Sequence, residues 1–392
     1  MHSRLFVIFA CLASTTSAFA SSPEVKLRAG IDFQAGYYSD NAKGPLSTKN
    51  VSADKKYTAF NSTAYVAADA KNTLDSGFVY GAQINLATTA KNTRKLASFI
   101  YTESNAGRWE LGSNKSAYAT MKVHGYSNAC ATAGGWDVWV RSDPANRGGV
   151  YITNFGNFLD PKTRNSSEVE YSRKITYYTP ELKNFQLGVS YIPDTTNIGS
   201  KSFSDADRHD PTRSRVYNID IRDGIALGLT HKHEFTNDFK IRSAIVGEMG
   251  KPVQAVKPTQ AQIAWKKLRT YTIGTEVTYK DFSIAGSYMD YMKSITSSVI
   301  DTLGRDSRVY GATARYNHTE KLSYSLSYFS SKHKASSMNT TTLATQYKLA
   351  PGILPYAEVS LYKTSGRHIK NNQLIQDGYK GALVLFGAKL EL

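Results

Sequence analysis

Charged side chains that alternate with apolar ones are the residues of this sequence best placed to act on other molecules. In residues 25–37, for example, Lys26 and Arg28 alternate with Val25 and Leu27. Charges held in such a pattern attract, repel or orient a solute, whereas bond-breaking chemistry needs a nucleophile or a base with a partner nearby. The charged residues that fall on the polar side of such stretches include the basic residues Lys26, Arg28, Arg108, Lys174, Arg242 and Arg315 and the acids Asp32, Glu110 and Glu276. About half of this set is expected to be simply solvated; the alternation is cleanest at Arg28 and Arg315.

Motifs for catalysis or metal binding are not found in the sequence, which has no G-x-S-x-G, P-loop or C-x-x-C pattern. His231 and His233 would share one face of a strand, but no third ligand is close to them. Their alternation continues that of Leu227 and Leu229, so we expect them in an aromatic belt near a turn. The sequence therefore predicts no enzyme, no metal site and no cofactor.

The elements that must position the charged residues are β-strands, because the apolar residues recur with a period of two. In "LSYSLSYF" (322–329), Leu322, Tyr324, Leu326 and Tyr328 alternate with serines, which makes one oily and one hydroxyl face. Strands of roughly 9–13 residues span a bilayer when they are tilted. The predicted strands are 25–37, 58–71, 78–88, 97–104, 108–113, 168–179, 185–193, 215–233, 240–249, 268–279, 282–291, 308–316, 322–332, 340–349, 354–363 and 381–392.

The connections between these strands alternate in length. Short turns such as 180–184 and 317–321 are followed by long polar segments such as 193–214 and 290–306. This is the layout of an all-β, transmembrane, antiparallel up-and-down β-barrel of about 16 strands. A soluble sandwich or propeller also alternates, but its apolar faces point inward and it would need a deep core of Leu, Ile and Phe. The polar faces here carry Ser, Thr, Gln, Arg and Glu, which suit a water-filled lumen.

The first twenty residues have the pattern of a secretory signal peptide, with Arg4, a short apolar stretch and Ala18-Phe19-Ala20. We therefore expect two segments, a leader (1–20) and a barrel domain (21–392). Removal of the leader would leave Cys130 as a single cysteine, so no internal disulfide is predicted. The chain carries a formal net charge of +16, but its charges are scattered and accompany no nucleic-acid-binding motif. We expect no nucleic-acid partner.

Four segments resemble the general, trimeric porins of Gram-negative bacteria. They are 25–40, 76–88, 107–123 and the hairpin "KITYYTPELKNFQLGVSYIPD" (174–194), and the hairpin is the most specific of the four. Among Gram-negative porins, the sequence most resembles those of alphaproteobacteria. The resemblance covers essentially the whole mature chain. It implies a sixteen-stranded homotrimer in the cell outer membrane, in contact with lipid and lipopolysaccharide. One departure is the last residue, Leu392, where porins typically end in Phe.

The resemblance also implies that the third outer loop, 113–167, folds into the barrel and narrows it. Long loops of about fifty residues are usually functional. In the family, loop carboxylates face a ladder of Arg and Lys across the opening. The loop residues that would contribute here are Asp137, Arg141, Asp143 and Asp160, opposite the wall residues named above. Trp136 and Trp139 are expected to anchor the loop, and a sugar-stacking patch is the alternative.

Together these features predict a water-filled channel for passive diffusion of small hydrophilic solutes and ions. The excess of basic residues favours a weak preference for anions. Two alternatives remain open from the sequence: a solute-specific channel with an aromatic and charged binding site, and a surface barrel with a structural or adhesive role.

Overall fold

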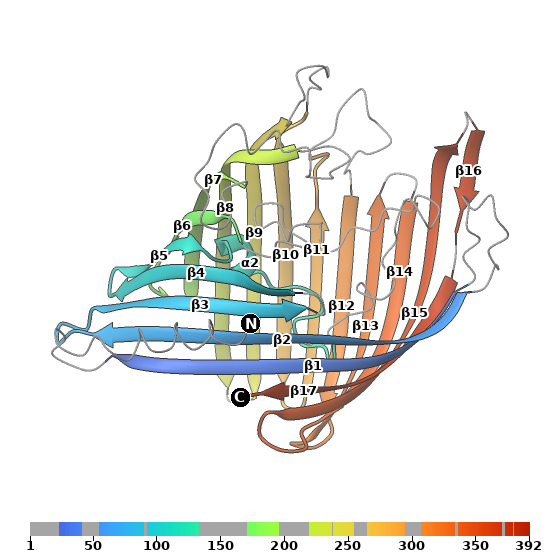
Figure 1. The fold of residues 1–392 in the computed structure, drawn as a ribbon, viewed down its shortest axis with the longest axis horizontal. Coiled ribbons are helices and arrows are strands. Elements are labelled where there is room, and N and C mark those ends of the chain that lie inside the picture. The colour runs from blue at the N-terminus through green and yellow to red at the C-terminus, as the bar shows by residue number, and fades with distance from the viewer. Residues whose placement is uncertain are drawn as a thin grey trace.

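The protein is a β-barrel in which each strand pairs with its neighbour in the sequence (Figure 1). The computed structural model describes residues 23–40, 55–89, 92–132, 171–195, 219–236, 238–254, 265–294, 307–333, 336–370, 373–378 and 380–392. The first strand, β1 (Glu24–Asp40), pairs antiparallel with the last, β17 (Lys380–Glu391), and this pairing closes the sheet. The predicted closed, antiparallel barrel of 16 strands is confirmed.

Between β1 and β17 the barrel wall continues in chain order through fourteen further strands. They are β2 (Lys55–Thr73), β3 (Val79–Thr89), β4 (Asn92–Ser104), β5 (Gly107–Ser113), β6 (Arg173–Tyr178), β7 (Phe185–Asp194), β8 (Ile219–Thr236), β9 (Phe239–Gln254), β10 (Leu268–Tyr279), β11 (Phe282–Asp290), β12 (Ser307–Asn317), β13 (Leu322–His333), β14 (Ser336–Tyr347) and β15 (Ile353–Lys370).

The closure of the barrel extends to the last residue of the chain. The Leu392 amide donates to the Ala29 carbonyl at 2.8 Å, and the Ala29 amide donates to the Leu392 carbonyl at 3.0 Å. A closed ladder pairs the backbone groups of every strand, which is the condition for a sheet to lie in hydrocarbon. The backbone pairing therefore continues as far as Leu392.

The oily face of the strands lies on the outside of the barrel. On β13, Tyr324, Leu326 and Tyr328 are exposed while Ser325 and Ser327 on the opposite face are buried. Serine and threonine hydroxyls pair between neighbouring strands on the inner face, for example Thr313 with Ser327 at 2.7 Å. The orientation expected for "LSYSLSYF" is therefore the one observed.

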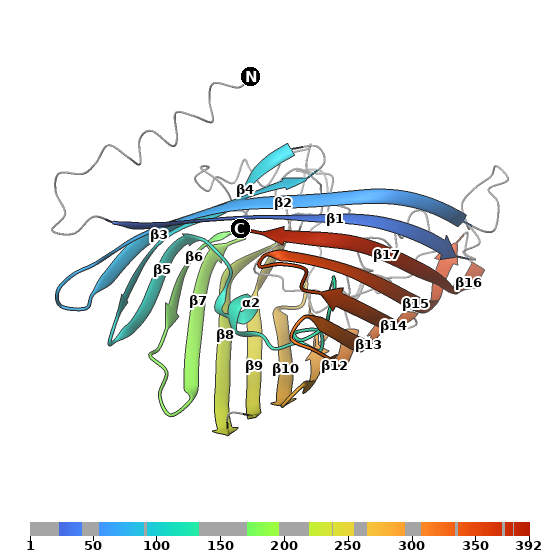
Figure 2. The same ribbon diagram turned by 90° about the horizontal axis from the view of Figure 1, so that it is seen from below.

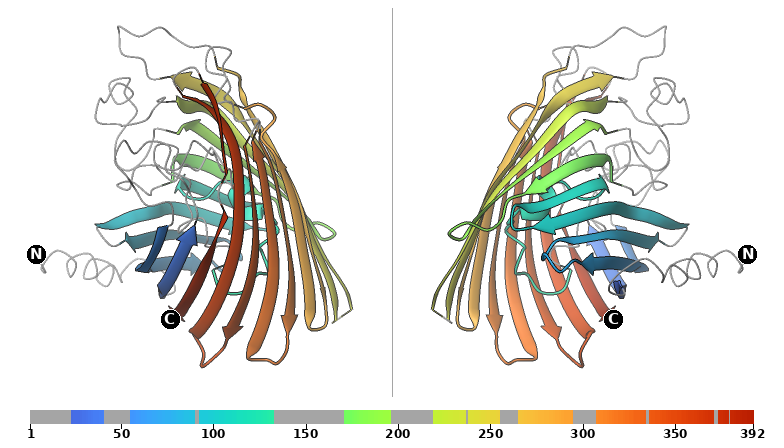
Figure 3. Two further views of the ribbon diagram at one scale, coloured as in Figure 1. Left: turned by 90° about the vertical axis from the view of Figure 1, so that its right-hand side faces the viewer. Right: turned by 90° about the vertical axis from the view of Figure 1, so that its left-hand side faces the viewer.

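The two ends of the barrel differ, as the alternation of connection lengths predicted (Figure 3). We call them the short-turn end, where β6 and β7 or β10 and β11 are joined, and the long-loop end. Several strands extend further toward the long-loop end than expected. β9 continues to Gln254, and β15 continues to Lys370 because its last residues pair with β16 (Gln373–Asp377), a short strand in a segment expected to be loop.

The inner face near the long-loop end is apolar, whereas the sequence predicted a polar inner face. Val309, Phe329, Met338, Leu383 and Leu385 all lie on inward positions there, and they are fully buried. The predicted polar inner face is therefore found in the middle of the barrel and at its short-turn end only. Alternation identifies two faces, but it does not tell which inward positions are covered by other parts of the chain.

The described helix α2 (Ala117–Met121) is a single short turn after β5, with Ser116 at its N-cap. No helix in the described ranges is long and apolar enough to cross a membrane.

Candidate pore constriction

Residues 114–132, which follow β5, lie inside the ring of strands (Figure 2). They contain α2 and then run as irregular chain along the inner wall, with contacts that range from Lys174 of β6 to Lys389 of β17. We call this part of the long connection the inner segment. The expectation that the connection after β5 folds into the barrel is met in this described part; the strands on either side end at Ser113 and begin again at Arg173.

The root of the connection is held by the buried ammonium group of Lys174. Its Nζ donates to the carbonyl of Asn114, where the inner segment begins, and to the carbonyl of Ser172 at 2.7 Å, where the chain returns to β6. Nζ also lies 5.7 Å from the centre of the Tyr171 ring. Lys174 therefore faces inward as predicted, but it ties the two ends of the connection together and is covered from the lumen.

Arg108 and Glu110 lie beside this root. Arg108 Nε is 2.8 Å from a Glu110 carboxylate oxygen, and its Nη1 is 3.2 Å from Glu103. The guanidinium group stacks 4.0 Å above the Tyr101 ring. Glu110 in turn accepts a hydrogen bond from the side chain of Asn114. The structure thus brings Arg108, Glu110 and Lys174 together in one network that supports the inner segment.

Glycines in the barrel wall make room for α2. A methyl group on Gly188 of β7 would lie 2.4 Å from Sδ of Met121, and one on Gly228 of β8 would lie 2.7 Å from it. The amide of Ala117 donates to the Ser190 hydroxyl at 2.8 Å. The short helix therefore rests directly on the backbone of two neighbouring strands, which side chains at these glycines would prevent.

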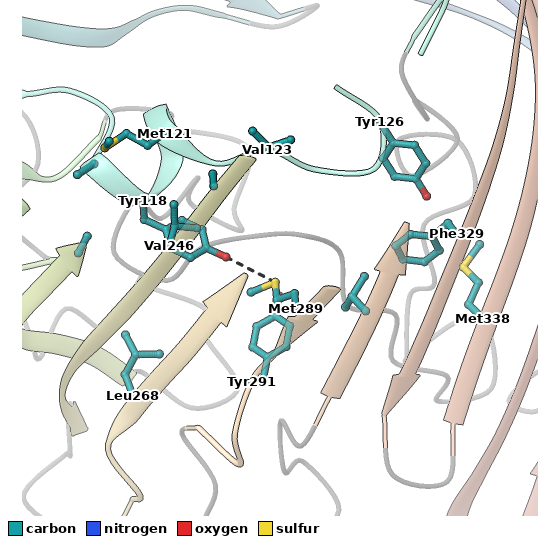
Figure 4. Close-up of a cluster of buried hydrophobic side chains, with 14 of the residues drawn as sticks. Tyr118, Met121, Val123, Tyr126, Val246, Leu268, Met289, Tyr291, Phe329 and Met338 are labelled. Atoms are coloured by element: carbon teal, nitrogen blue, oxygen red, sulfur yellow. Dashed lines mark hydrogen bonds between the residues drawn. The ribbon is translucent and has the colours of Figure 1, made fainter. Parts of the chain in front are cut away.

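Aromatic and sulfur-containing side chains complete the seat of the inner segment (Figure 4). The Tyr118 hydroxyl lies 2.6 Å from the hydroxyl of Thr272 and 3.6 Å from Sδ of Met289. Further along, Tyr126 stacks on Phe329 with ring centres 6.2 Å apart. Sulfur and ring contacts of this kind stabilise packing beyond the area that they bury.

The irregular chain after α2 approaches the wall even more closely. A methyl group on Gly274 of β10 would lie 2.0 Å from the Val123 carbonyl oxygen, and one on Gly125 would lie 2.1 Å from the Gly311 carbonyl carbon on β12. The amide of Gly125 donates to Ser287 at 2.7 Å. Backbone therefore lies against backbone at these positions.

From Ser127 onward, five residues of the inner segment bond to the wall, and the partners advance from β10 to β15. The Ser127 hydroxyl donates to Glu276 at 2.7 Å, and the Asn128 side chain donates to Ser283 at 2.9 Å. The remaining bonds are Cys130 amide to Ser325 hydroxyl at 2.9 Å, Ala131 amide to Gln346 at 3.2 Å, and Thr132 hydroxyl to Glu358 at 2.6 Å. Lys389 of β17 donates to the Ala131 carbonyl. The inner segment is thus tethered across half of the barrel wall.

The other predicted basic residues lie on the inner face. Arg28 and Arg242 are exposed there, and Arg315 is partly buried with hydrogen bonds to Asn317 at 2.9 Å and to Ser323 at 3.0 Å. Lys26 lies nearer the short-turn end and forms an exposed ion pair with Glu24 at 2.9 Å. The wall therefore presents basic groups from β1, β9 and β12, spread around the lumen and apart from the network of Arg108.

Four carboxylates of the inner face are engaged with hydroxyl groups. Asp32 accepts from Tyr356 at 2.7 Å, and Asp69 accepts from Tyr101 at 2.8 Å. Glu276 and Glu358 accept from the inner segment, and Glu358 is almost completely buried. The inner acids thus hold the segment and the tyrosines in place, whereas Arg28 and Arg242 extend into the open part of the barrel.

His124 and Cys130 of the inner segment have shifted pKa values. Burial, together with the nearby charges of Lys122 and Arg242, lowers the pKa of His124 to about 4. His124 Nδ1 accepts a hydrogen bond from the Tyr126 amide at 3.2 Å, which requires an unprotonated nitrogen. Burial also raises the pKa of the Cys130 thiol. Both groups are therefore uncharged at neutral pH, as packed residues rather than reactive ones.

Four predicted loop residues, Asp137, Arg141, Asp143 and Asp160, lie outside the described residues, as do Trp136 and Trp139. Conversely, Glu358 and Lys389 anchor the end of the inner segment, although neither was among the site residues predicted from the sequence. A signal for both was present, because Glu358 alternates with Val359 and Leu361, and Lys389 with Ala388 and Leu390. Alternation could place them inside the barrel, but not against Thr132 and Ala131.

His231 and His233 lie in a row of rings on the outer face at the short-turn end. His231 packs against Phe185 with ring centres 4.5 Å apart, and His233 against Phe235 at 4.2 Å. The row continues through Phe239 to Tyr279. No group of three possible metal ligands occurs among the residues that the structure describes. The position in an aromatic belt, expected from the sequence, is the one observed.

A closed sixteen-stranded barrel with an oily outside, a charged inside and a segment of its own chain laid along the inner wall defines a channel of the porin class. A family model described as Gram-negative porin matches residues 7–367. The chain belongs to this family, and the resemblance noted in the sequence is confirmed. Family and fold both point to the outer membrane, and the family consists of channels rather than enzymes.

The chain is also similar to individual proteins and solved structures. An uncharacterized protein of Rickettsia conorii (strain Malish 7) is 28% identical over 415 residues, which cover 95% of this chain and 93% of that protein. The structure is similar to the anion-selective porin from Comamonas acidovorans, with a TM-score of 0.60, 14% identity, and coverage of 95% of this chain and 100% of that one. It is also similar to the trimer form of OmpT from Vibrio cholerae, with a TM-score of 0.56, 10% identity, and coverage of 95% and 100%. At these identities the two solved structures show a shared fold.

Proposed function

We propose that the chain forms a water-filled pore in the outer membrane through which small hydrophilic solutes diffuse passively, with a weak preference for anions. The leader 1–20 would direct export and be removed. The porin family and fold support the channel itself. The preference for anions follows from the charges on the inner face, and the specific solutes are those whose size and charge the constriction admits.

The observation that carries the anion preference is the unequal use of charged groups inside the barrel. Glu358 is buried, and Asp32, Asp69 and Glu276 each accept a short hydrogen bond from a hydroxyl group. Arg28 and Arg242 are exposed on the same face. A permeating ion interacts most strongly with charges that lie close to its path, since water screens the more distant ones. We therefore expect the exposed Arg28 and Arg242 to act on a passing ion more strongly than the buried Glu358 does.

The test is a planar-bilayer recording on the refolded mature protein under a gradient of KCl. A weakly anion-selective pore gives a reversal potential whose sign is that of the chloride equilibrium potential. Uncharged solutes of increasing size, added to the same recordings, give the size above which solutes no longer pass. A reversal potential set by potassium would overturn the anion preference. Absence of any conductance from correctly folded barrels would overturn the proposal of an open pore.

We further propose that three copies assemble through the outer face of β17, β1, β2 and β3. This face is rich in alanine, with Ala64, Ala68 and Ala70 of β2 opposite Ile31, Leu27 and Val25 of β1. Small residues let neighbouring barrels approach closely. By contrast, the outer face of β10 to β13 carries the large rings of Tyr271, Tyr288, Tyr310 and Tyr328, which suit the lipid interface. A structural neighbour from Vibrio cholerae is described as a trimer form, which supports three copies but does not identify the face.

Two matched variants test the trimer. Ala64→Arg adds a charge to the proposed interface, and Ala312→Arg adds one to the outer face of β12, opposite Gly286. An arginine in the lipid-facing band costs up to about 2–4 kcal/mol in either place, depending on depth. Only Ala64→Arg is expected to convert trimers to monomers in gel electrophoresis without heating. Equal behaviour of the two variants would contradict this assignment of the interface.

A further inference from the structure

β1, β2 and β3 form the part of the wall that follows the end of the described inner segment. Lys389 of β17, which donates to the Ala131 carbonyl, lies directly opposite Asp32 of β1. Gly30 is two residues from Asp32 on the same inward face, and it lies directly opposite Tyr65 of β2. Tyr65 is therefore on the inner wall, beside the place where the inner segment is tethered to β17.

Three tyrosines of the inner wall lie over a glycine of the neighbouring strand. The pairs are Tyr65 over Gly30, Tyr101 over Gly81 and Tyr356 over Gly387. Tyr101 and Tyr356 are buried, and their hydroxyl groups donate to carboxylates of the same wall. Tyr65 differs from them, because it is 40% exposed and its hydroxyl has no hydrogen-bond partner among the described residues. Support of the wall accounts for the first two rings, but it leaves the exposed ring of Tyr65 without a role.

Arg28 lies beside Tyr65 on the same inner face. It belongs to β1, two residues from Gly30, and it lies directly opposite Ala67 of β2, two residues from Tyr65. Arg28 is exposed, and within the described ranges no carboxylate forms an ion pair with it. Lys26, its inward neighbour on β1, is paired with Glu24 instead. A guanidinium group with no acid partner is a ready-made site for a carboxylate, which it holds through two parallel hydrogen bonds.

An amide group completes this part of the wall from the next strand. Asn85 of β3 lies directly opposite Ala67, on the side away from Arg28. Gln83 donates to the Asn85 side-chain oxygen at 3.0 Å. That bond uses the oxygen, so the Asn85 amide nitrogen is the group that can donate to a solute. Side chains in directly opposite positions start roughly 5 Å apart, and the short Ala67 between them brings Arg28 and Asn85 within reach of one small molecule.

The three groups select for two chemical features at once. The guanidinium of Arg28 attracts an anion, and a carboxylate matches its geometry. The exposed ring of Tyr65 offers an apolar face, on which another ring can stack. Arg242 on β9 is also exposed, but it lies directly opposite Glu276, which competes with an anionic solute. A solute that carries both a carboxylate and a ring therefore gains more at β1 to β3 than at Arg242.

We propose that Arg28, Tyr65 and Asn85 form a binding site for small ring carboxylates, that is, organic anions in which a carboxylate is attached to a ring. We call these three residues the open-wall site. The inference rests on the proposed function in taking the lumen as the path of solutes, and it names a class of solute for that path. Arg28 pairs with the carboxylate, the solute ring stacks on Tyr65, and Asn85 donates to an oxygen of the solute. Because the site is open to water, it binds weakly enough to release the solute again.

The test is equilibrium dialysis of the folded, detergent-solubilised protein against labelled probes. Benzoate carries both features, acetate lacks the ring, and benzyl alcohol lacks the charge. The variants are Arg28→Gln, Tyr65→Leu and Tyr65→Phe, of which the last keeps the ring. The matched controls are Arg242→Gln, which removes an exposed arginine from the inner face of β9, and Tyr324→Leu, which removes an exposed tyrosine from the outer face.

The unchanged protein is expected to bind benzoate more tightly than either of the other probes. Tyr65→Leu should weaken benzoate binding about threefold to tenfold and leave acetate binding unaltered, whereas Tyr65→Phe should bind as the unchanged protein does. Arg28→Gln should weaken benzoate binding about tenfold. Both control variants should bind benzoate as the unchanged protein does.

Three results would overturn the open-wall site: equal binding of acetate and benzoate, no effect of Tyr65→Leu, or equal weakening by Arg28→Gln and Arg242→Gln. Conductance of the same samples separates this proposal from that of the pore. A barrel that conducts ions and binds no benzoate would contradict the site alone. A barrel that binds benzoate at Arg28 and Tyr65 and conducts no ions would contradict the pore alone.

Discussion

Thr132 and Glu358 form the outermost described tether of the inner segment. The Thr132 hydroxyl donates to a Glu358 oxygen at 2.6 Å, and the Thr132 amide donates to the same oxygen at 3.3 Å. The other Glu358 oxygen accepts from Ser360 at 3.2 Å. A buried carboxylate on β15 thereby receives a loop residue more than two hundred positions earlier in the chain, and the loop cannot move at this point without leaving that carboxylate without these donors.

Replacing Glu358 by glutamine is expected to loosen the inner segment at Thr132. The change removes a negative charge from two hydrogen bonds, which is worth about 1–3 kcal/mol. Cys130, two residues away and fully buried, reports the loosening, because its thiol becomes reactive only when the segment lifts off the wall. The expected result is a rise of about tenfold or more in the rate of Cys130 labelling by a thiol reagent.

The control for this experiment is Glu320→Gln, which changes an exposed turn residue at the short-turn end. Its labelling rate should equal that of the unchanged protein. If Glu358→Gln left the labelling rate unaltered, Glu358 would not be the tether.

Gly125→Ala is expected to displace the middle of the inner segment. The added methyl group would meet the carbonyl carbon of Gly311 at 2.1 Å and its oxygen at 2.3 Å, which are backbone atoms that cannot turn aside. Overpacking of this kind costs about 1–3 kcal/mol. Single-channel recordings should show a changed conductance together with more frequent current fluctuations.

Gly286→Ala provides the matched comparison, because nothing lies within 4 Å of the methyl group that it adds on β11. Its conductance should remain that of the unchanged protein. If Gly125→Ala gave the same current traces as the unchanged protein, the backbone at Gly311 would have moved to accommodate the added methyl group, and the prediction would be wrong.

Arg242→Gln is expected to reduce the preference for anions. Arg242 is exposed on the inner face, directly opposite Glu276 of β10, so its removal leaves that carboxylate to act on passing ions. A unit charge at several ångströms in water contributes roughly 0.5–1 kcal/mol, which corresponds to a two- to fivefold change in the ratio of anion to cation permeability. Reversal potentials in a KCl gradient measure this ratio.

Lys183→Gln removes a charge of the same sign from a turn outside the lumen, and it should leave the reversal potential unchanged. A shift of the same size for both variants would mean that overall charge, and not the inner face, sets the selectivity.

His124 is expected to make the folded barrel less stable in acid. Its pKa falls to about 4 in the folded protein, against an ordinary value of 6.5. Between these two pH values the unfolded chain takes up a proton that the folded protein does not. The free energy of unfolding is therefore unaffected by this proton above pH 6.5. It decreases as the pH falls toward 4, by up to about 3 kcal/mol.

The temperature at which the barrel unfolds, followed by electrophoretic mobility from pH 7.5 to 4.5, measures this effect. His124→Asn keeps an oxygen that can accept from the Tyr126 amide but cannot take up the proton, so its curve should be flatter in this range. His318→Gln, in an exposed turn, should keep the steep curve. Parallel curves for all three proteins would rule out His124 as the source.

The sequence alone predicted the sixteen strands of the wall, their two faces and their order, but not β16 or the full length of β9 and β15. Alternation at Leu326 and Ser327 depends on local geometry, because neighbouring side chains of a strand must point to opposite sides. Short and long connections then decide which strands are neighbours and which end of the barrel is which. The inward direction of Arg28, Arg242 and Arg315 followed from the same rule.

The tertiary structure alone decided what each inward residue does. Lys174 and Arg242 have the same alternation, yet Lys174 is buried at the root of the connection while Arg242 extends into the lumen. The difference arises because residues 114–132 cover one part of the wall, with partners up to β17 that are brought close only when the barrel closes. Contacts between Thr132 and Glu358, or Gly125 and Gly311, join residues far apart in the chain, and no local pattern encodes such a meeting.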